Sequence, residues 1–152
     1  MKFKLIAIGS RIMEDDSIAL RVAEEIKDKI NKDIEIIIGE TDFEYCLERI
    51  DENDFLIILD TTLIGVNPGD ISKMDLKEVY NYKDYFYSQH QLSLVELLDL
   101  YKINVKGLIL GIEAYNISFS NNLSKVLKDK FNIICNEVIK EINMIIEGEN
   151  YA

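Results

Sequence analysis

The chain has 152 residues, of which 17 are basic and 28 acidic, so its formal net charge is −11. This acidity argues against a nucleic-acid binder, which needs clustered lysine and arginine, and against docking on an anionic membrane surface. No apolar stretch approaches the roughly 20 residues of a membrane span, and the first residues meet charge too soon for a signal peptide. Hydrophobic residues make up 48% of the chain, enough for an ordinary core. We expect a soluble cytoplasmic protein with a single domain over residues 1–152, acting as a monomer.

The cysteines give no sign of an oxidising compartment. Cys46 and Cys135 form no CxxC pair and are too few for a disulfide framework. Both fall at apolar helix positions, so we expect two thiols in the core.

In the first half of the chain, apolar runs alternate with stretches at helical spacing. Lys2–Ile8 predicts a first strand, and an apolar stripe then predicts a helix over Ile18–Ile26. Ile34–Ile38 predicts a second strand, followed by a short helix around Phe43–Arg49. Phe55–Leu59 is continuously apolar and bounded by acids, which is typical of a strand buried on both faces of a parallel sheet.

The second half continues the alternation after a turn at residues 65–69, which holds the chain's only proline. Ile71–Met74 predicts a short strand, placed as an antiparallel edge. A helix is predicted over Leu92–Leu100 and a last strand over Leu108–Ile112. A long final helix presents one apolar face, made of Leu123, Val126, Leu127, Ile134, Val138, Ile142 and Ile145.

Strands that alternate with helices imply βαβ crossovers and a sheet covered on both sides. We therefore predict a three-layer α/β/α sandwich of the phosphorylase/hydrolase-like kind, with a mostly parallel, twisted sheet of about five strands.

Three segments deliver polar residues to the carboxyl ends of the strands, where open α/β sheets bind ligands. The loop after the first strand carries Asp16, and Asp60 directly follows the apolar run of the third strand. The segment before the next helix carries His90, the only histidine in the chain. Two carboxylates and one imidazole at one edge would suit a divalent transition metal such as nickel, zinc, manganese or iron, and three protein ligands leave positions open for a substrate group.

Each of these residues also has a plain structural interpretation. Asp15 or Asp16 could cap the first helix, Asp60 could end its strand in a turn, and His90 could be a surface or capping residue. Two further charged residues of the first loop are expected to be solvated, namely Arg11 and Glu14. The sequence offers no GxSxG, HExxH, P-loop or GxGxxG motif, and only Ser88 neighbours the histidine as a candidate nucleophile.

Four stretches, in order, resemble the [NiFe]-hydrogenase maturation endopeptidases. The first, IAIGSRIMEDDSIALRVAEEI, is similar to that family's opening strand, glycine turn, paired acids and first helix. FLIILDTTLIGVNPGDI is similar to its strand that ends in aspartate before a Pro-Gly turn, and SQHQLSLVELL to its histidine segment. LILGIEAYNISFSNNLSKVL is similar to its late strand, Gly-Ile-Glu turn and final helix. The resemblance covers nearly the whole chain.

The resemblance implies a protease that removes the C-terminal extension of a hydrogenase large-subunit precursor. It places the family's three metal-contacting positions on Asp16, Asp60 and His90, which would also be the catalytic set, and it matches Gly9 to the glycine of the first turn. The nickel would be supplied by the substrate, although another divalent metal could substitute. The hydrolysis would be either aspartic-type or metal-assisted.

Several positions depart from the family pattern and suggest a divergent subfamily, attached to an unusual hydrogenase. The family's glycines, asparagine and proline near the site are replaced at Ala7, Ser10, Ser17, Ala19 and Ala114, and its Asp-Gly-Gly-Thr is reduced to Ile-Gly39-Glu-Thr41.

A protein substrate needs a contact surface, and the tyrosine-rich segment Tyr80–Tyr87 is one candidate, although its rings could equally cover the sheet edge. Two alternatives to the peptidase remain. One is a divergent or inactive relative of the fold, similar to spore-associated proteases. The other is a phosphoacceptor receiver domain, which would carry its paired acids closer to the strand tip than Asp16 lies.

Overall fold

A computed structural model describes residues 1–30, 33–79 and 90–150, with the backbone alone for 90–93 and 150. Its centre is one five-stranded sheet in the order β2-β1-β3-β5-β4. The strands are β1 (Lys2–Ile8), β2 (Ile34–Glu40), β3 (Asp54–Thr62), β4 (Ile71–Asp75) and β5 (Lys106–Glu113). All neighbours pair in parallel except β4, which pairs antiparallel with β5 at the edge.

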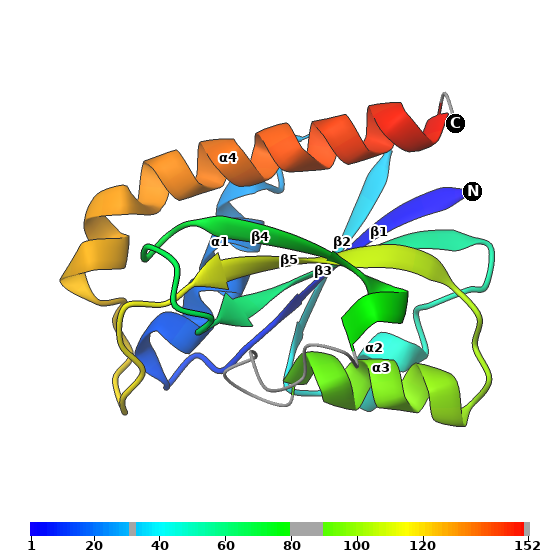
Figure 1. The fold of residues 1–152 in the computed structure, drawn as a ribbon, viewed down its shortest axis with the longest axis horizontal. Helices are drawn as coiled ribbons and strands as arrows, with labels where there is room; N and C mark the ends of the chain where they lie inside the picture. Colours follow the sequence, from blue (N-terminus) through cyan, green and yellow to red (C-terminus); the bar gives the residue numbers. More distant parts are fainter. Residues whose placement is uncertain (31–32, 80–89, 151–152) are drawn as a thin grey trace.

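Helices cover both faces of this sheet (Figure 1). The chain forms α1 (Ile18–Ile26), α2 (Phe43–Leu47), α3 (His90–Leu100) and α4 (Lys125–Asn150), and the 3-10 turn η1 (Glu14–Ser17) precedes α1. α1 and α4 pack on one face, and α2 and α3 pack on the other. The result is the predicted three-layer α/β/α fold.

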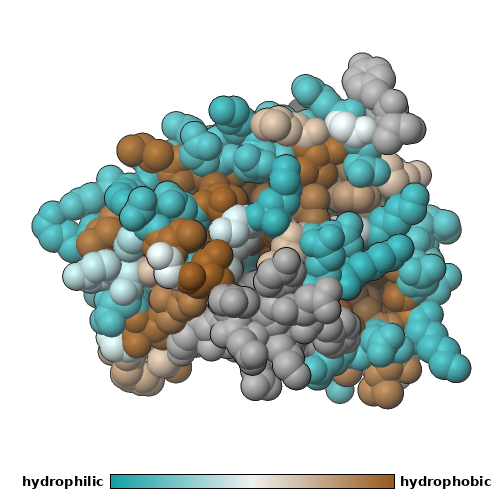
Figure 2. Space-filling model, in the orientation of Figure 1, coloured by the Kyte–Doolittle hydropathy of each residue, from teal (hydrophilic) through white to brown (hydrophobic). Residues whose placement is uncertain are grey.

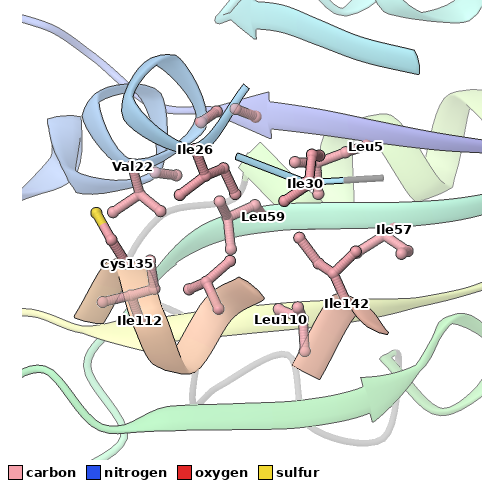
Figure 3. Packing of buried hydrophobic residues seen from close by; sticks show 14 of the residues in the cluster. Leu5, Val22, Ile26, Ile30, Ile57, Leu59, Leu110, Ile112, Cys135 and Ile142 are labelled. Atoms are coloured by element: carbon pink, nitrogen blue, oxygen red, sulfur yellow. The ribbon is translucent and has the colours of Figure 1, made fainter. Parts of the chain in front are cut away.

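The two faces of β3 supply the two halves of the core. All nine of its residues are buried. Because alternate side chains of a strand point to opposite faces, Ile57 and Leu59 join the cluster under α1 and α4, whereas Ile58 joins the cluster under α2 and α3. Figure 3 shows Leu59 directed at the side chains that α1 contributes, among them Val22 and Ile26.

The structure confirms the predicted strands and helices and corrects some of their bounds. β4 is the antiparallel edge strand that was expected. β3, however, does not end at Leu59, because Asp60, Thr61 and Thr62 continue its pairing with β5. Asp60 is therefore a strand residue and not the turn residue of the structural alternative. The predicted irregular segment Tyr80–Gln89 lies outside the described residues.

Two further expectations concern the cysteines and a membrane-spanning helix. Cys46 and Cys135 are buried free thiols, as predicted. Burial raises the pKa of each thiol to about 11, so neither is a reactive thiolate. Within the described ranges, no helix has both the length and the apolar composition to cross a bilayer.

Candidate functional site

The candidate site lies where β1, β3 and β5 end, at the carboxyl edge of the sheet. Its first wall is the loop after β1, which turns at Gly9. This glycine has φ +151°, and a Cβ there would stand 2.1 Å from the backbone oxygen of Asp16. A side chain is therefore excluded, as the resemblance implied. The turn brings the amide of Ser10 to within 3.1 Å of Asp16 Oδ2, to which it donates.

Asp16 is a buried carboxylate inside η1. Only 1% of its surface is exposed. Burial raises its pKa to about 6, and the hydrogen bond from Ser10 offsets part of that effect. Since such a group titrates near neutral pH, it can take up or release a proton under physiological conditions.

Asp60 is still more enclosed, near the end of β3, with no exposed surface. Burial raises its pKa well above the usual value, the hydrogen bond from the Thr61 amide opposes this, and the nearby charge of Asp16 raises the pKa further. Its Oδ1 accepts that Thr61 hydrogen bond at 2.7 Å, and its Oδ2 has no hydrogen-bond partner within the described part of the chain. The structure thus brings two of the three predicted site residues together as a coupled acid pair.

His90 is the first residue of α3. In Figure 1 this helix begins near the middle of the view and runs to the right, so its first residue is at the end nearer to the arrowheads of β3 and β5 in this view. Its backbone position is therefore compatible with the edge where the two aspartates lie, and its side chain is outside the described residues. Among the described side chains alone, no group of three His, Cys, Asp or Glu forms a metal site.

Asp15 does not cap the first helix, contrary to the structural interpretation given above. Ser17, rather than Asp15 or Asp16, holds the N-cap position of α1. The carboxylate of Asp15 is fully buried and turns the other way, into the loop between β5 and α4. There it accepts hydrogen bonds from the amides of Tyr115 and Asn116, each at 3.0 Å, and of Ser124, at 2.8 Å. Asp15 therefore ties the first loop of the site to the last one.

The two charged residues expected to be solvated are both engaged. Glu14 is half-buried, and its Oε1 accepts hydrogen bonds from Asn116 Nδ2 at 2.9 Å and Ser118 Oγ at 2.7 Å. Arg11 is exposed, but its guanidinium bridges Glu24 at 2.8 Å and Glu40 at 2.7 Å. Glu40 has a left-handed backbone with φ +53°. The ion pair with Arg11 accompanies this unusual conformation.

Sequence reasoning missed Glu113, the last residue of β5. Its side chain is buried, and its carboxylate accepts hydrogen bonds from Thr62 Oγ1 at 2.9 Å, the Ile64 amide at 3.1 Å and the Gly65 amide at 2.9 Å. It thereby fixes the loop after β3. The rule that selected Asp60, an acid directly after an apolar strand, would also have selected Glu113, which was treated only as part of a turn.

Comparison with known proteins identifies the family of this chain. The family model described as hydrogenase maturation protease (HycI) matches residues 20–141, which include Asp60 and His90 and begin just after Asp16. The protein named "Putative hydrogenase maturation protease" from Methanocaldococcus jannaschii is 23% identical over 147 residues, covering 90% of this chain and 96% of its own.

Solved structures agree on the fold. The hydrogenase maturating endopeptidase HybD from E. coli superposes with a TM-score of 0.78 at 20% identity, over 95% of this chain and 93% of its own. The [NiFe] hydrogenase maturation protease HybD from Thermococcus kodakarensis gives 0.74 at 20% identity, over 92% and 98%. With the family model matching most of its length, this chain belongs to the hydrogenase maturation protease family.

Proposed function

We propose that this protein is an endopeptidase that removes the C-terminal extension of a [NiFe]-hydrogenase large-subunit precursor after nickel insertion. In this proposal Asp16, Asp60 and His90 contact the nickel ion that the substrate carries. Cleavage takes place in the cytoplasm, whose reducing conditions suit the two free thiols.

The observation that carries the proposal is the buried pair Asp16 and Asp60 at the carboxyl edge of the sheet, in a chain of this family. Burial raises the pKa of Asp60 most, and the nearby charge of Asp16 raises it further, since two carboxylates that share a buried site repel one another when both are ionised. A divalent cation would relieve that repulsion by binding both oxygens. Oxygen and imidazole ligands without thiolate fit nickel, so the donor set suits the proposed substrate.

A substrate-borne ion gives the reaction a checkpoint. A precursor without nickel would lack the group that Asp16, Asp60 and His90 contact, and it would bind less well. Holding the ion also fixes the scissile peptide against the protease, which lowers the entropic cost of reaching a reactive geometry.

Two routes to hydrolysis fit these residues. In an aspartic-type route, a carboxylate with a pKa near 6, as Asp16 has, takes a proton from the attacking water. In a metal-assisted route, the scissile carbonyl or the water is polarised by the substrate's nickel. A precursor that carries Zn²⁺ instead of nickel distinguishes the two routes. In the aspartic-type route, the pH dependence of the cleavage rate stays the same whichever ion the substrate carries.

The test is the mass of the large-subunit precursor after incubation with purified protein. We expect the wild type to shorten the nickel-loaded precursor and to leave the precursor from nickel-starved cells intact. Asp16→Asn, Asp60→Asn and His90→Ala should slow cleavage by about 10²- to 10⁴-fold. The control Asp99→Asn removes an exposed acid on α3 and should cleave normally.

Two outcomes would contradict the proposal. Normal cleavage by His90→Ala would remove the histidine from the site. A wild-type protein that shortens no hydrogenase precursor would overturn the function itself.

A further inference from the structure

We propose that the loops around the acid pair form a preorganised docking surface for the folded body of the large-subunit precursor. This inference rests on the proposed function and adds to it the surface that holds the substrate. The surface consists of the exposed side chains of Ile12, Leu63, Val66, Tyr115 and Phe119, called here the apolar rim.

The rim gathers residues that are far apart in sequence. Eleven large hydrophobic side chains are exposed among the described residues, and five of them belong to the loops that follow β1, β3 and β5. Because these three strands run parallel, the loops emerge at one edge, beside Asp16 and Asp60. Figure 2 shows apolar residues reaching the surface on the left of the molecule, the side on which β3 and β5 end.

Backbone hydrogen bonds join the loops into one surface. The amide of Ser120 donates to the oxygen of Ile12, and the amide of Glu14 donates to the oxygen of Ser120, both at 3.0 Å. The amide of Ala114 donates to the oxygen of Thr62 at 3.0 Å, which links the loop after β5 to that after β3. Backbone hydrogen bonds therefore join the three loops that carry the five rim residues.

Charge distribution distinguishes two of the three loops that carry the rim, those after β3 and β5, from the rest of the surface. Charged residues make up 30% of the chain, yet residues 61–69 and 114–124 contain none. Apart from their apolar members, these loops are made of Ser, Thr, Asn, Gly, Ala and Pro. Protein interfaces lose charged residues at their centre and gain aromatic ones, with serine and asparagine supplying adaptable hydrogen bonds.

Two buried carboxylates also hold these loops in place. Asp15 accepts hydrogen bonds from three amides between β5 and α4, and Glu113 accepts them from two amides of the loop after β3 and from the hydroxyl of Thr62, the last residue of β3. Both carboxylates are buried, at 0% and 2% exposure. Fixing a contact surface before binding lowers the entropy lost on association, which is the advantage a docking surface gains from such support.

The occupant is the precursor rather than a second copy of this chain. Two copies would each bring a net charge of −11 and repel one another as they approach. The chain that carries the rim also reaches the acid pair, because Thr61, two residues before Leu63, donates its amide to Asp60 Oδ1 at 2.7 Å and its Oγ1 to the Asp15 oxygen at 3.3 Å. A partner seated on the rim is therefore positioned for cleavage.

The experiment compares matched charge insertions. Tyr115→Asp and Phe119→Asp place a carboxylate on the rim, at side chains 59% and 81% exposed. The controls Tyr101→Asp and Leu100→Asp do the same at the end of α3, at 61% and 70% exposure. Since all four side chains face solvent, we expect unchanged circular dichroism and thermal unfolding for every variant.

Binding and cleavage of the purified nickel-loaded precursor are then measured separately. We expect each rim variant to raise KM and the dissociation constant by roughly tenfold or more while kcat stays within about twofold. The two controls should match the wild type.

The outcomes separate this inference from the proposed function. Cleavage with unchanged KM in both rim variants overturns the docking surface and leaves the function standing. Precursor binding that the rim variants weaken, without any cleavage by the wild type, supports the surface and overturns the function. A wild-type dimer in sedimentation that Phe119→Asp dissolves would assign the rim to self-association, and absence of both binding and cleavage would overturn both proposals.

Discussion

The two ends of β3 carry buried aspartates in opposite electrostatic settings. At the amino end, Asp54 is 6% exposed, and its Oδ2 lies 2.7 Å from Lys4 Nζ of the neighbouring strand. The same oxygen accepts the Asp51 amide at 2.7 Å, and the Lys4 ammonium also donates to the Arg49 oxygen. The charge of Asp54 is thus matched by a cation and hydrogen bonds, which is how a folded protein accommodates a buried acid.

At the carboxyl end of the same strand, Asp60 faces another acid. Burial raises its pKa well above the ordinary value, the charge of Asp16 raises it further, and no described cation offsets these effects. This arrangement works against folding, because both carboxylates are buried and the charge of Asp16 makes ionisation of Asp60 harder still. A buried acid that lacks a matching charge is a feature of functional sites, whereas a matched pair is ordinary structure.

Exchanging each aspartate for asparagine should give the largest and most clearly opposed effects. Asp54→Asn removes the closer of the two carboxylates that pair with Lys4 and leaves Glu35 at 4.0 Å. We expect the free energy of unfolding to fall by about 3 kcal/mol while the folded protein keeps its activity. Asp60→Asn removes a poorly tolerated charge and keeps an acceptor for the Thr61 amide. We expect it to unfold at a higher temperature at pH 7 while cleavage slows by about 10²- to 10⁴-fold.

Denaturant unfolding and precursor cleavage, measured on both variants, decide this prediction. A stability loss in Asp60→Asn as large as that in Asp54→Asn would mean that Asp60 is as structural as Asp54, and the contrast between the two ends would disappear.

A smaller effect should come from the carboxylates that hold the loops. In Asp15→Asn, an NH₂ group replaces one acceptor oxygen and faces a backbone amide, so at least one buried hydrogen bond is lost. We expect the free energy of unfolding to fall by about 2 kcal/mol. KM for the precursor should also rise, because the loop after β5 carries Tyr115 and Phe119.

The matched control is Asp75→Asn, at an exposed aspartate that accepts the Lys77 amide at 2.8 Å. It should change stability by less than about 1 kcal/mol, because solvent replaces the lost bond, and should leave KM unchanged. If Asp15→Asn lowers stability but leaves KM unchanged, the carboxylate supports the fold without contributing to the docking surface.

Local pattern was enough to predict the layers of the fold but not the end of β3. Apolar runs identify β1, β3 and β5, because burial of a strand leaves a mark in consecutive residues, whereas the edge strand β4 has no fully buried residue. Beyond Leu59, the strand continues through polar residues that are nevertheless buried. Thr61 and Thr62 are accommodated there by Asp15 and Glu113, which lie 46 and 51 residues away. Such distant partners leave no trace in a short window of sequence.

Some residues of the candidate site could likewise be predicted from local sequence, and others could not. Asp16 and Asp60 were expected at one edge because parallel strands end together, and their electrostatic coupling agrees with that expectation. The role of Asp15 could not be predicted, since its carboxylate binds amides that follow it by 100 to 109 residues. Helix capping was the local alternative, and a tertiary contact prevailed over it. The placement of the His90 side chain stays a prediction.

The smallest expected effect is a pH dependence of stability that arises at the carboxyl end of β3. The pKa of Asp16 is about 6 in the folded protein, against an ordinary value of 3.8. Between these values the folded state holds a proton that the unfolded chain has released, so this group lowers stability as pH rises from about 4 to about 6, and its effect is constant above that. Asp16→Asn should remove this fall and gain stability relative to the wild type as pH rises from 4 to 7, whereas Asp99→Asn should follow the wild type across the range. Unfolding free energies from denaturant titrations at each pH give the difference directly. If the difference in unfolding free energy between the wild type and Asp16→Asn does not change with pH, Asp16 has an ordinary pKa. The acid pair is then no more costly to bury than Asp54.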